Sequence, residues 1–256
     1  MTVTMLPRGS GTGETGRMDC LYIVIPAYNE SSNIESCVRD WYPVAEKHSA
    51  GGTSRLVIVN DGSRDDTWEK LTALAKDRPL LLPLTKENGG HGSAVLFGYR
   101  YAIEHGADYV FQTDSDGQTL PEEFEPFWEK RAECDAVIGE RGKRGDGKGR
   151  KFVENVVCLL LRLVFGVRVK DANAPFRLMR SSLLAKYIGR LPADFNIPNI
   201  MFTAYFVRCG EKVTFLPITF RPRQGGTNSI NLRKMIRIGW KALGDFRKLK
   251  KEMNNQ

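Results

Sequence analysis

Strand-like and helix-like stretches alternate through the first half of the chain, and this alternation restricts the possible folds more than any other feature. Runs of aliphatic and β-branched residues, such as LYIVIPAY at 21–28 and RLVIVND at 55–61, are each followed by a stretch with helical periodicity. The alternation continues to DAVIGE at 135–140. Successive strand–helix units predict an α/β fold, a single Rossmann-like domain with a mostly parallel central sheet flanked by helices.

Polar residues gather where the predicted strands end. Tyr28 and Glu30 follow the first strand, Asp61 follows the second, and Asp114 and Asp116 follow YVFQT at 109–113. In a parallel sheet, ligands bind outside the carboxyl ends of the strands. The sequence therefore predicts that these side chains line one crevice.

A dinucleotide-binding fold would contain a similar sheet, but its glycine-rich turn is absent after the first strand, where the chain reads PAYNES. The phosphate-binding motif G-x-x-x-x-G-K-[ST] is also absent. Gly89, Gly90 and Gly92 precede a predicted helix and could let backbone N–H groups approach an anion. A plain turn is the alternative interpretation of these glycines.

The segment TDSDGQ at 113–118 carries two acids one residue apart. A calcium loop of the EF-hand kind would start at Gln112, but it would contain Pro121 and would follow a strand where a helix is needed. Alternate residues of an extended chain point to the same side, so Asp114, Asp116 and the amide oxygen of Gln118 share a face if the chain stays extended here. These oxygen donors favour Mg²⁺ or Mn²⁺ holding a diphosphate.

The 256-residue chain has a formal net charge of +8, with lysines and arginines concentrated at 141–151 and 231–252. Such patches attract phosphates of nucleic acid, anionic lipid or a small-molecule diphosphate, although a solvated charged face is the alternative. Five cysteines occur without a C-x-x-C pair, which is typical of reduced thiols in a cytoplasmic protein.

The composition divides the chain into three parts. Residues 1–18 are rich in Gly and Thr without a signal-peptide core, and we expect a flexible tail. Residues 19–230 form the predicted domain, and 231–256 a basic amphipathic helix. The stretch KFVENVVCLLLRLVFG at 151–166 is also amphipathic but too short and charged to span a membrane. Core packing and membrane contact remain alternatives for each helix, and together they favour peripheral association with the cytoplasmic membrane face.

The motifs IVIPAYNE, VIVNDGSRDDT, ENGGHGSAVLFG and TDSDGQ, in this order over residues 20–230, resemble those of family-two nucleotide-sugar glycosyltransferases of GT-A fold. The chain looks most like polyprenyl-phosphate sugar transferases of the dolichol-phosphate mannose synthase type. DANAPFRLMR resembles their D-x-x-x-G-F-R-x-x-R segment, with Pro175 in place of glycine. LPITFRPRQGGTNS resembles their P-I-x-F-x-x-R-x-x-G-x-S segment, with Asn228 or Ser229 for its serine.

The resemblance implies metal-dependent, inverting transfer of a sugar from a UDP- or GDP-sugar to dolichyl or undecaprenyl phosphate. It also implies a role for each matching residue. The nucleoside pocket would be formed by Pro26, Ala27, Tyr28 and Glu30, with Asp61 accepting a hydrogen bond from the base. The metal would be held by Asp114, Asp116 and Gln118. On the phosphate side would lie Arg223 and Arg177. Asp116 and Arg223 would be the catalytic pair.

The acceptor is inferred from a missing acid. A hydroxyl acceptor needs a general base, which this family commonly supplies as an Asp in a helix beyond the metal site. In ADFNIPNIMFTAYFVRCG at 193–210 the only acid is Asp194, and Asn196 and Asn199 occupy the helix start. A phosphate is already anionic and needs no base, so the pattern favours a lipid phosphate.

We also expect Arg141 and Arg144, in a mobile basic loop at 141–151, to draw the lipid phosphate towards the sugar. Two alternatives remain open. The acceptor would be a hydroxyl of a glycan, lipid or small molecule if Asp194 or Asp171 served as the base. A basic nucleic-acid-binding protein would use the positive patches, but it leaves the acidic strand ends unexplained, so no nucleic-acid partner is expected.

Overall fold

The computed structural model describes residues 19–49, 52–142 and 148–222. The predicted tail at 1–18, the predicted helix at 231–256 and the domain boundary at 230 lie outside these residues. Arg144 and Arg223 lie outside them as well.

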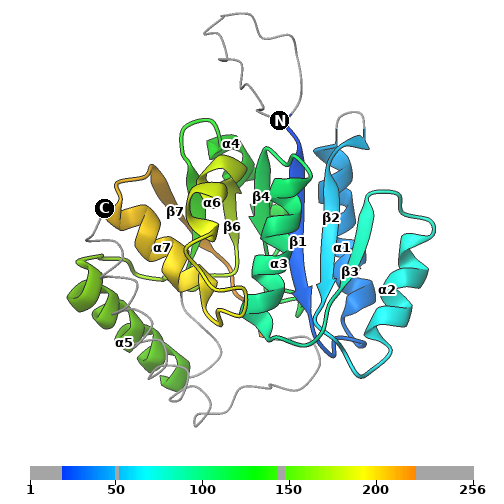
Figure 1. The fold of residues 1–256 in the computed structure, drawn as a ribbon, viewed down its shortest axis with the longest axis horizontal. Coiled ribbons are helices and arrows are strands. Elements are labelled where there is room, and N and C mark those ends of the chain that lie inside the picture. Colours follow the sequence, from blue (N-terminus) through cyan, green and yellow to red (C-terminus); the bar gives the residue numbers. More distant parts are fainter. Residues whose placement is uncertain (1–18, 50–51, 143–147, 223–256) are drawn as a thin grey trace, which may run out of the picture.

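One seven-stranded sheet in the order β3-β2-β1-β4-β6-β5-β7 runs through the described residues (Figure 1). Neighbouring strands are parallel except at β6, which is antiparallel to both β4 and β5. The strands are β1 Leu21–Ala27, β2 Arg55–Asn60, β3 Leu81–Thr85, β4 Tyr109–Gln112, β5 Ala136–Arg141, β6 Arg177–Arg180 and β7 Val213–Ile218.

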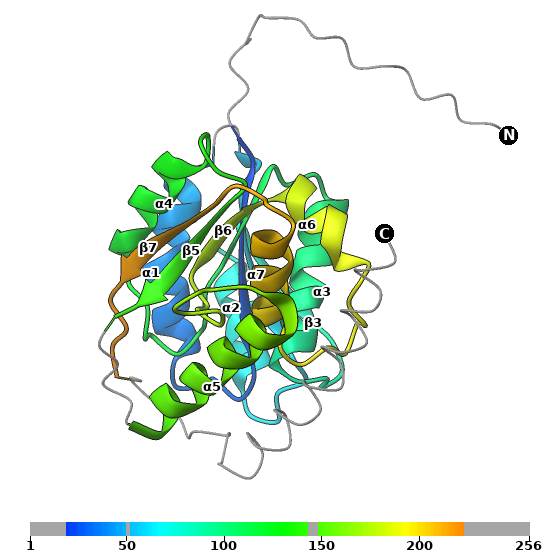
Figure 2. The ribbon, with the colours of Figure 1, turned by 90° about the vertical axis from the view of Figure 1, so that its left-hand side faces the viewer.

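Helices cover both faces of the sheet (Figures 1 and 2). Residues of α1, α2 and α4 pack into one hydrophobic core, and residues of α3, α5, α6 and α7 pack into the other. The helices are α1 Ile34–Lys47, α2 Thr67–Ala75, α3 His91–Glu104, the 3₁₀ turn η2 Pro121–Glu123, α4 Phe124–Lys130, α5 Lys148–Phe165, α6 Ser181–Ile188 and α7 Pro198–Arg208.

Strand β1 shows why the sheet has two buried faces. Leu21, Ile23 and Ile25 lie in the core on the α1 side, whereas Tyr22 and Val24 lie in the core on the α3 side. Alternate residues of a strand point to opposite faces, so a nearly continuous apolar run is typical of a central parallel strand. The predicted α/β fold with a mostly parallel sheet is confirmed.

The reversed direction of β6 was not part of the sequence prediction. This strand has only four residues and carries arginine at both ends, so it lacks the apolar run by which β1 and β2 are recognised. Its direction comes from pairing, because Arg177 lies opposite Gln112 of β4 and Ile138 of β5.

Helix α3 lies close to the sheet at Gly98. A Cβ atom at this position would stand 2.4 Å from Val24 Cγ1 and 3.2 Å from Val59 Cγ2. Valine side chains are stiff at χ1, so neither neighbour can turn away freely. The missing side chain therefore allows α3 to pack across β1 and β2, and this fixes the start of α3 beside the strand ends.

We expect Gly98→Ala to lower the free energy of unfolding by about 1 kcal/mol, because overpacking costs about 1–3 kcal/mol and the gain in helix propensity returns about 1 kcal/mol. Urea unfolding measures the change. Gly189→Ala is the control, since Gly189 has a φ of −67° and open space around its Cβ position. A Gly98→Ala variant as stable as the wild type would contradict the close packing.

Candidate functional site

At one edge of the sheet, the loop after β4 contacts the end of β1, and the loops after β1 and β2 contact each other. Ser115 Oγ donates a hydrogen bond of 3.0 Å to the Pro26 carbonyl. The backbone N–H of Asn29 donates to Ser63 Oγ at 3.0 Å, and the N–H of Arg64 donates to Asn29 Oδ1 at 2.8 Å. Asn29 does not cap the following helix, because its side chain holds the neighbouring loop and α1 begins only at Ile34.

Asp61 anchors the glycine-rich segment that precedes α3. Its carboxylate is 2% exposed and accepts hydrogen bonds from Lys86 Nζ at 2.8 Å and from the backbone N–H groups of Gly89 at 3.0 Å and Gly90 at 2.7 Å. Asn88 Nδ2 adds a longer contact of 3.3 Å. The anion at these glycines is thus the chain's own carboxylate, placed at the helix end where a negative charge is stabilised.

Asp61 is not the N-cap residue of the following helix α2, because that position is occupied by Asp66. A carboxylate has about four acceptor sites, and the four donors around Asp61 occupy them. The predicted hydrogen bond to a base stays a prediction, and it requires one of these donors, such as Lys86, to move away.

The residues predicted for the nucleoside differ in exposure. Tyr28 is 37% exposed at the strand end. Glu30 is buried, where its Oε2 accepts from Asn33 Nδ2 at 2.6 Å and its N–H donates to Thr67 Oγ1 at 2.9 Å. The carbonyl of the buried Ala27 accepts from the Asp61 N–H at 2.9 Å. Tyr28 is thus the residue of this set with a side chain open to a ligand.

The acidic segment 113–118 follows strand β4 directly. The side chain of Gln112 is buried and accepts a hydrogen bond from the Tyr99 hydroxyl at 2.9 Å. The EF-hand alternative is therefore wrong, since a strand precedes the loop and its first ligand position is occupied inside the core.

Asp114 has the property expected of a cation ligand. Its Oδ1 atom is buried and has no hydrogen-bond partner among the described residues. Buried acceptors without a partner are rare and indicate a missing water or ion. Asp116 follows two residues later, and its Oδ1 accepts from the Gln118 N–H at 3.2 Å. These oxygen donors fit a hard divalent cation.

Gln118 joins this loop to the chain beyond β7. Its Nε2 donates to the Arg221 carbonyl at 2.8 Å, and the Arg221 N–H donates to the Gln118 carbonyl at 2.8 Å. Metal binding by Gln118 stays a prediction. Across residues 19–49, 52–142 and 148–222, no group of three or more His, Cys, Asp or Glu gathers as for a closed metal site. A cation here would need ligands from a bound diphosphate.

The structure corrects the expectation that Arg141 belongs to a mobile basic loop. Arg141 is the last residue of β5, and its side chain is 6% exposed. Its Nε and Nη2 donate to the two carboxylate oxygens of Asp171 at 2.6 and 2.8 Å, and Asp171 is 2% exposed. The two side chains form a buried bidentate pair, so a contact between Arg141 and a lipid phosphate stays a prediction that requires this pair to open.

The pair also shifts the titration of Asp171. Burial alone would raise the pKa of this carboxyl. The hydrogen bond from Arg141 and its positive charge lower the pKa by more, so the net shift is downward. A carboxylate with a depressed pKa is a weak base. This geometry disfavours the alternative in which Asp171 activates a hydroxyl acceptor.

Arg177 is fully buried at the start of β6. Its guanidinium donates to the carbonyls of Ala174 at 2.8 Å and Asn199 at 3.0 Å. Burial lowers the pKa of Arg177 to about 10, which leaves the side chain charged at neutral pH. The geometry gives Arg177 a positioning role between β6 and α7, and its predicted contact with substrate stays a prediction.

The start of α7 lies against the start of α3. A Cβ atom on Gly92 would stand 2.2 Å from the Phe195 carbonyl oxygen, so only glycine allows this approach. Asn199 is buried in the first turn of α7, and its Oδ1 has no partner within the described part of the chain. Asp194 is exposed before the helix, and residues 195–208 contain no acid.

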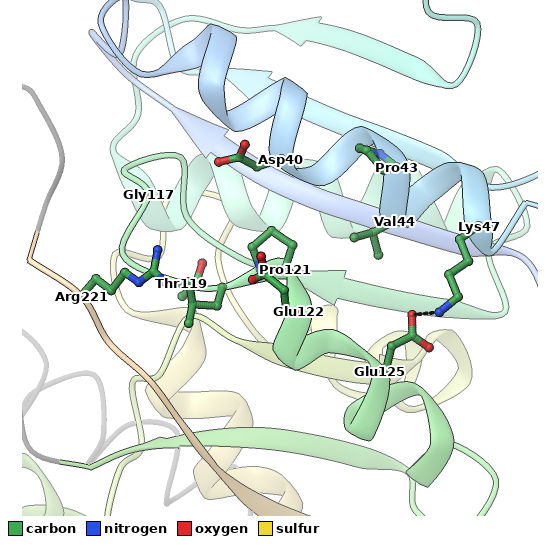
Figure 3. A pocket seen from close by; sticks show the side chains of 11 residues that line it. Asp40, Pro43, Val44, Lys47, Gly117, Thr119, Pro121, Glu122, Glu125 and Arg221 are labelled. Atoms are coloured by element: carbon green, nitrogen blue, oxygen red, sulfur yellow. Dashed lines mark ion pairs between the residues drawn. The ribbon is translucent and has the colours of Figure 1, made fainter.

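A separate hollow of about 420 Å³ lies on the α1 side of the acidic loop (Figure 3). It is bordered by Asp40 and Val44 of α1, by Thr119 of the loop and by Arg221, and the ion pair between Lys47 and Glu125 at 2.8 Å crosses one end. None of the residues predicted for the nucleoside or the metal lines it.

The chain belongs to glycosyl transferase family 2, because the sequence model of that family matches residues 22–188. Undecaprenyl-phosphate mannosyltransferase of Micrococcus luteus is 28% identical over 221 residues, which cover 81% of this chain and 86% of the relative. Undecaprenyl-phosphate 4-deoxy-4-formamido-L-arabinose transferase of Pectobacterium carotovorum is 26% identical over 224 residues, 86% of this chain. The chain spans 65% of that relative's length and 53% of its counterpart from Pseudomonas paraeruginosa.

Solved structures show the same fold. Glucosyl-3-phosphoglycerate synthase from Mycobacterium tuberculosis, in complex with Mn²⁺ and UDP-glucose, superposes with a TM-score of 0.64 over 90% of this chain and 79% of its own. Its sequence identity is 18%, so this likeness concerns the fold alone. The predicted GT-A fold is confirmed.

We expect Asp171→Asn to lower the free energy of unfolding at pH 7 by about 3–5 kcal/mol, because it removes the carboxylate that pairs with the buried Arg141. The folded pKa of Asp171 lies below its unfolded value, so this stabilisation is present above about pH 4 and is lost as the pH falls through the folded pKa. Urea unfolding between pH 3 and 7 measures it. Asp40→Asn, at a partly exposed carboxylate that pairs with the exposed Arg39, is the control, and an equal loss in both variants would contradict the account.

Proposed function

We propose that this protein transfers a sugar, with inversion at the anomeric carbon, from a UDP- or GDP-sugar to a polyprenyl phosphate. The observation that carries the proposal is the position of Asp114 and Asp116 at the edge where the ends of β1 and β2 also meet. The buried oxygen of Asp114 without a partner among the described residues supports a cation at this edge. The family membership supports the same reaction class.

The donor side depends on charge. When the bond between sugar and diphosphate breaks, negative charge grows on the leaving group, and a divalent cation such as Mg²⁺ or Mn²⁺ stabilises it. Asp114 and Asp116 would hold that cation, with Gln118 beside them. Tyr28 would contact the nucleoside, next to Asp61 and the buried Glu30. Arg223 is proposed as the arginine that pairs with a phosphate, since guanidinium suits bidentate contact.

The acceptor is proposed from two observations. The relatives from Micrococcus luteus and Pectobacterium carotovorum carry names that specify undecaprenyl phosphate. The start of α7, beside the start of α3, presents Asn199 and no acid. A phosphate oxygen is already anionic and attacks without a general base. A single displacement by this oxygen inverts the anomeric configuration.

The proposed site of action is the cytoplasmic membrane face. No helix among the described residues is long and apolar enough to cross a membrane. Helix α5 instead presents an apolar stripe to the outside: Val156 is 38%, Leu159 53% and Leu163 70% exposed. Leu161 and Phe165 of the same helix are buried in the core. An amphipathic helix of this kind supports peripheral contact with lipid.

Asp116→Asn should weaken Mn²⁺-dependent binding of UDP or GDP at least about tenfold, since a lost contact to a charged group costs about 1.5–3 kcal/mol. Calorimetric titration with and without Mn²⁺, over a panel of nucleotide sugars, measures this and finds the donor. Asp77→Asn, at an exposed residue just beyond the end of α2, is the control for the same chemical change. Equal affinity of Asp116→Asn and wild type would sink the assignment.

Replacing both Leu159 and Leu163 by Gln should reduce partitioning onto anionic phospholipid vesicles at least about tenfold, because burying each leucine contributes about 1.5–3 kcal/mol. Vesicle flotation measures the bound fraction. Phe97→Gln removes an exposed apolar side chain from α3 and is expected to bind as the wild type does. If the double variant floats as well as the wild type, α5 is not the contact.

A further inference from the structure

The buried oxygen of Asp114 has one neighbour that sequence reasoning did not single out. His91 is the first residue of α3, and its Nε2 lies 3.9 Å from Asp114 Oδ1. This separation is too long for a hydrogen bond. The His91 side chain is 52% exposed, so its imidazole is open to solvent while it lies near the Asp114 carboxylate.

Two protein features fix His91 in this place. Asp61 holds the N–H groups of Gly89 and Gly90, which lead directly into α3. Gly92 then lets the first turn of α3 approach the backbone at Phe195. The start of α3 is therefore held from both sides, and His91 is presented to the acidic loop by rigid backbone.

The separation of the two atoms suits a shared cation. Two ligand atoms that each lie about 2.1 Å from one ion can stand at most about 4.2 Å apart. The observed 3.9 Å is within this limit. We propose that His91 supplies a nitrogen ligand to the same cation as Asp114, so that the site prefers Mn²⁺ to Mg²⁺. This inference rests on the proposed function, because it specifies the cation of that site.

The preference follows from ligand chemistry. Mg²⁺ is bound almost entirely by oxygen atoms and gives up its waters reluctantly. First-row transition ions accept imidazole nitrogen, and their affinity for such sites rises from Mn²⁺ onward. One imidazole beside the Asp114 carboxylate therefore raises Mn²⁺ affinity relative to Mg²⁺.

The test uses Mn²⁺ as the probe, first alone and then with UDP or GDP, on the whole protein. Electron spin echo modulation of bound Mn²⁺ should show coupling to a histidine ¹⁴N nucleus, and this coupling should change to that of ¹⁵N when the histidines are ¹⁵N-labelled. His91→Ala should lose the coupling and bind Mn²⁺ at least about tenfold more weakly, with Mg²⁺ affinity nearly unchanged. His105→Ala, which removes the exposed histidine just beyond the other end of α3, should keep both properties.

Three outcomes overturn parts of the account separately. If Mn²⁺ binds through Asp114 without nitrogen coupling, and His91→Ala binds it equally well, the inference about His91 is wrong and the proposed function stands. If Mn²⁺ and Mg²⁺ affinities fall together in His91→Ala, the residue only positions the loop. If Asp114→Asn leaves Mn²⁺ binding unchanged, both the cation site and the ligand role of His91 are wrong.

Discussion

The carboxylate of Asp61 holds the crevice together because it accepts backbone hydrogen bonds from Gly89 and Gly90 at the start of α3. It joins the end of β2 to a helix that lies across β1 and β2, close to the sheet at Gly98. Through the same backbone, it places His91 beside Asp114. The proposed cation and nucleoside regions thus share one anchor, and a ligand meets a site whose backbone is already in position.

The half of the sheet beyond β4 is held by buried charges instead. Arg141 and Asp171 pair out of solvent, and Arg177 donates to backbone carbonyls near the start of α7. Burying these groups is costly unless each finds its partners. We interpret them as positioning residues that hold β5, β6 and α7 together, while the phosphate contacts expected of Arg141, Arg177 and Arg223 stay predictions.

The sequence predicts the first half of this fold well because β1 and β2 carry long apolar runs with clear helical stretches after them. It does not predict the reversed direction of β6. This strand has four residues, of which the first and last are arginine, so it lacks an apolar strand pattern, and its direction depends on pairing with Gln112 and Ile138. The same limit applies to the site. Asp114 and Asp116 are visible from their spacing, whereas the Arg141–Asp171 pair and the approach of His91 join residues 23 to 30 positions apart and emerge only in three dimensions.

The central claim is that an anionic lipid oxygen attacks the sugar at this crevice without a base. The most direct measurement offers the wild-type protein a labelled donor with undecaprenyl phosphate or, in matched vesicles, with undecaprenol, which lacks the phosphate. Mass spectrometry then identifies the linkage of the product. We predict a sugar phosphodiester of the lipid phosphate and no product with the alcohol, whereas a glycoside of undecaprenol would contradict the account.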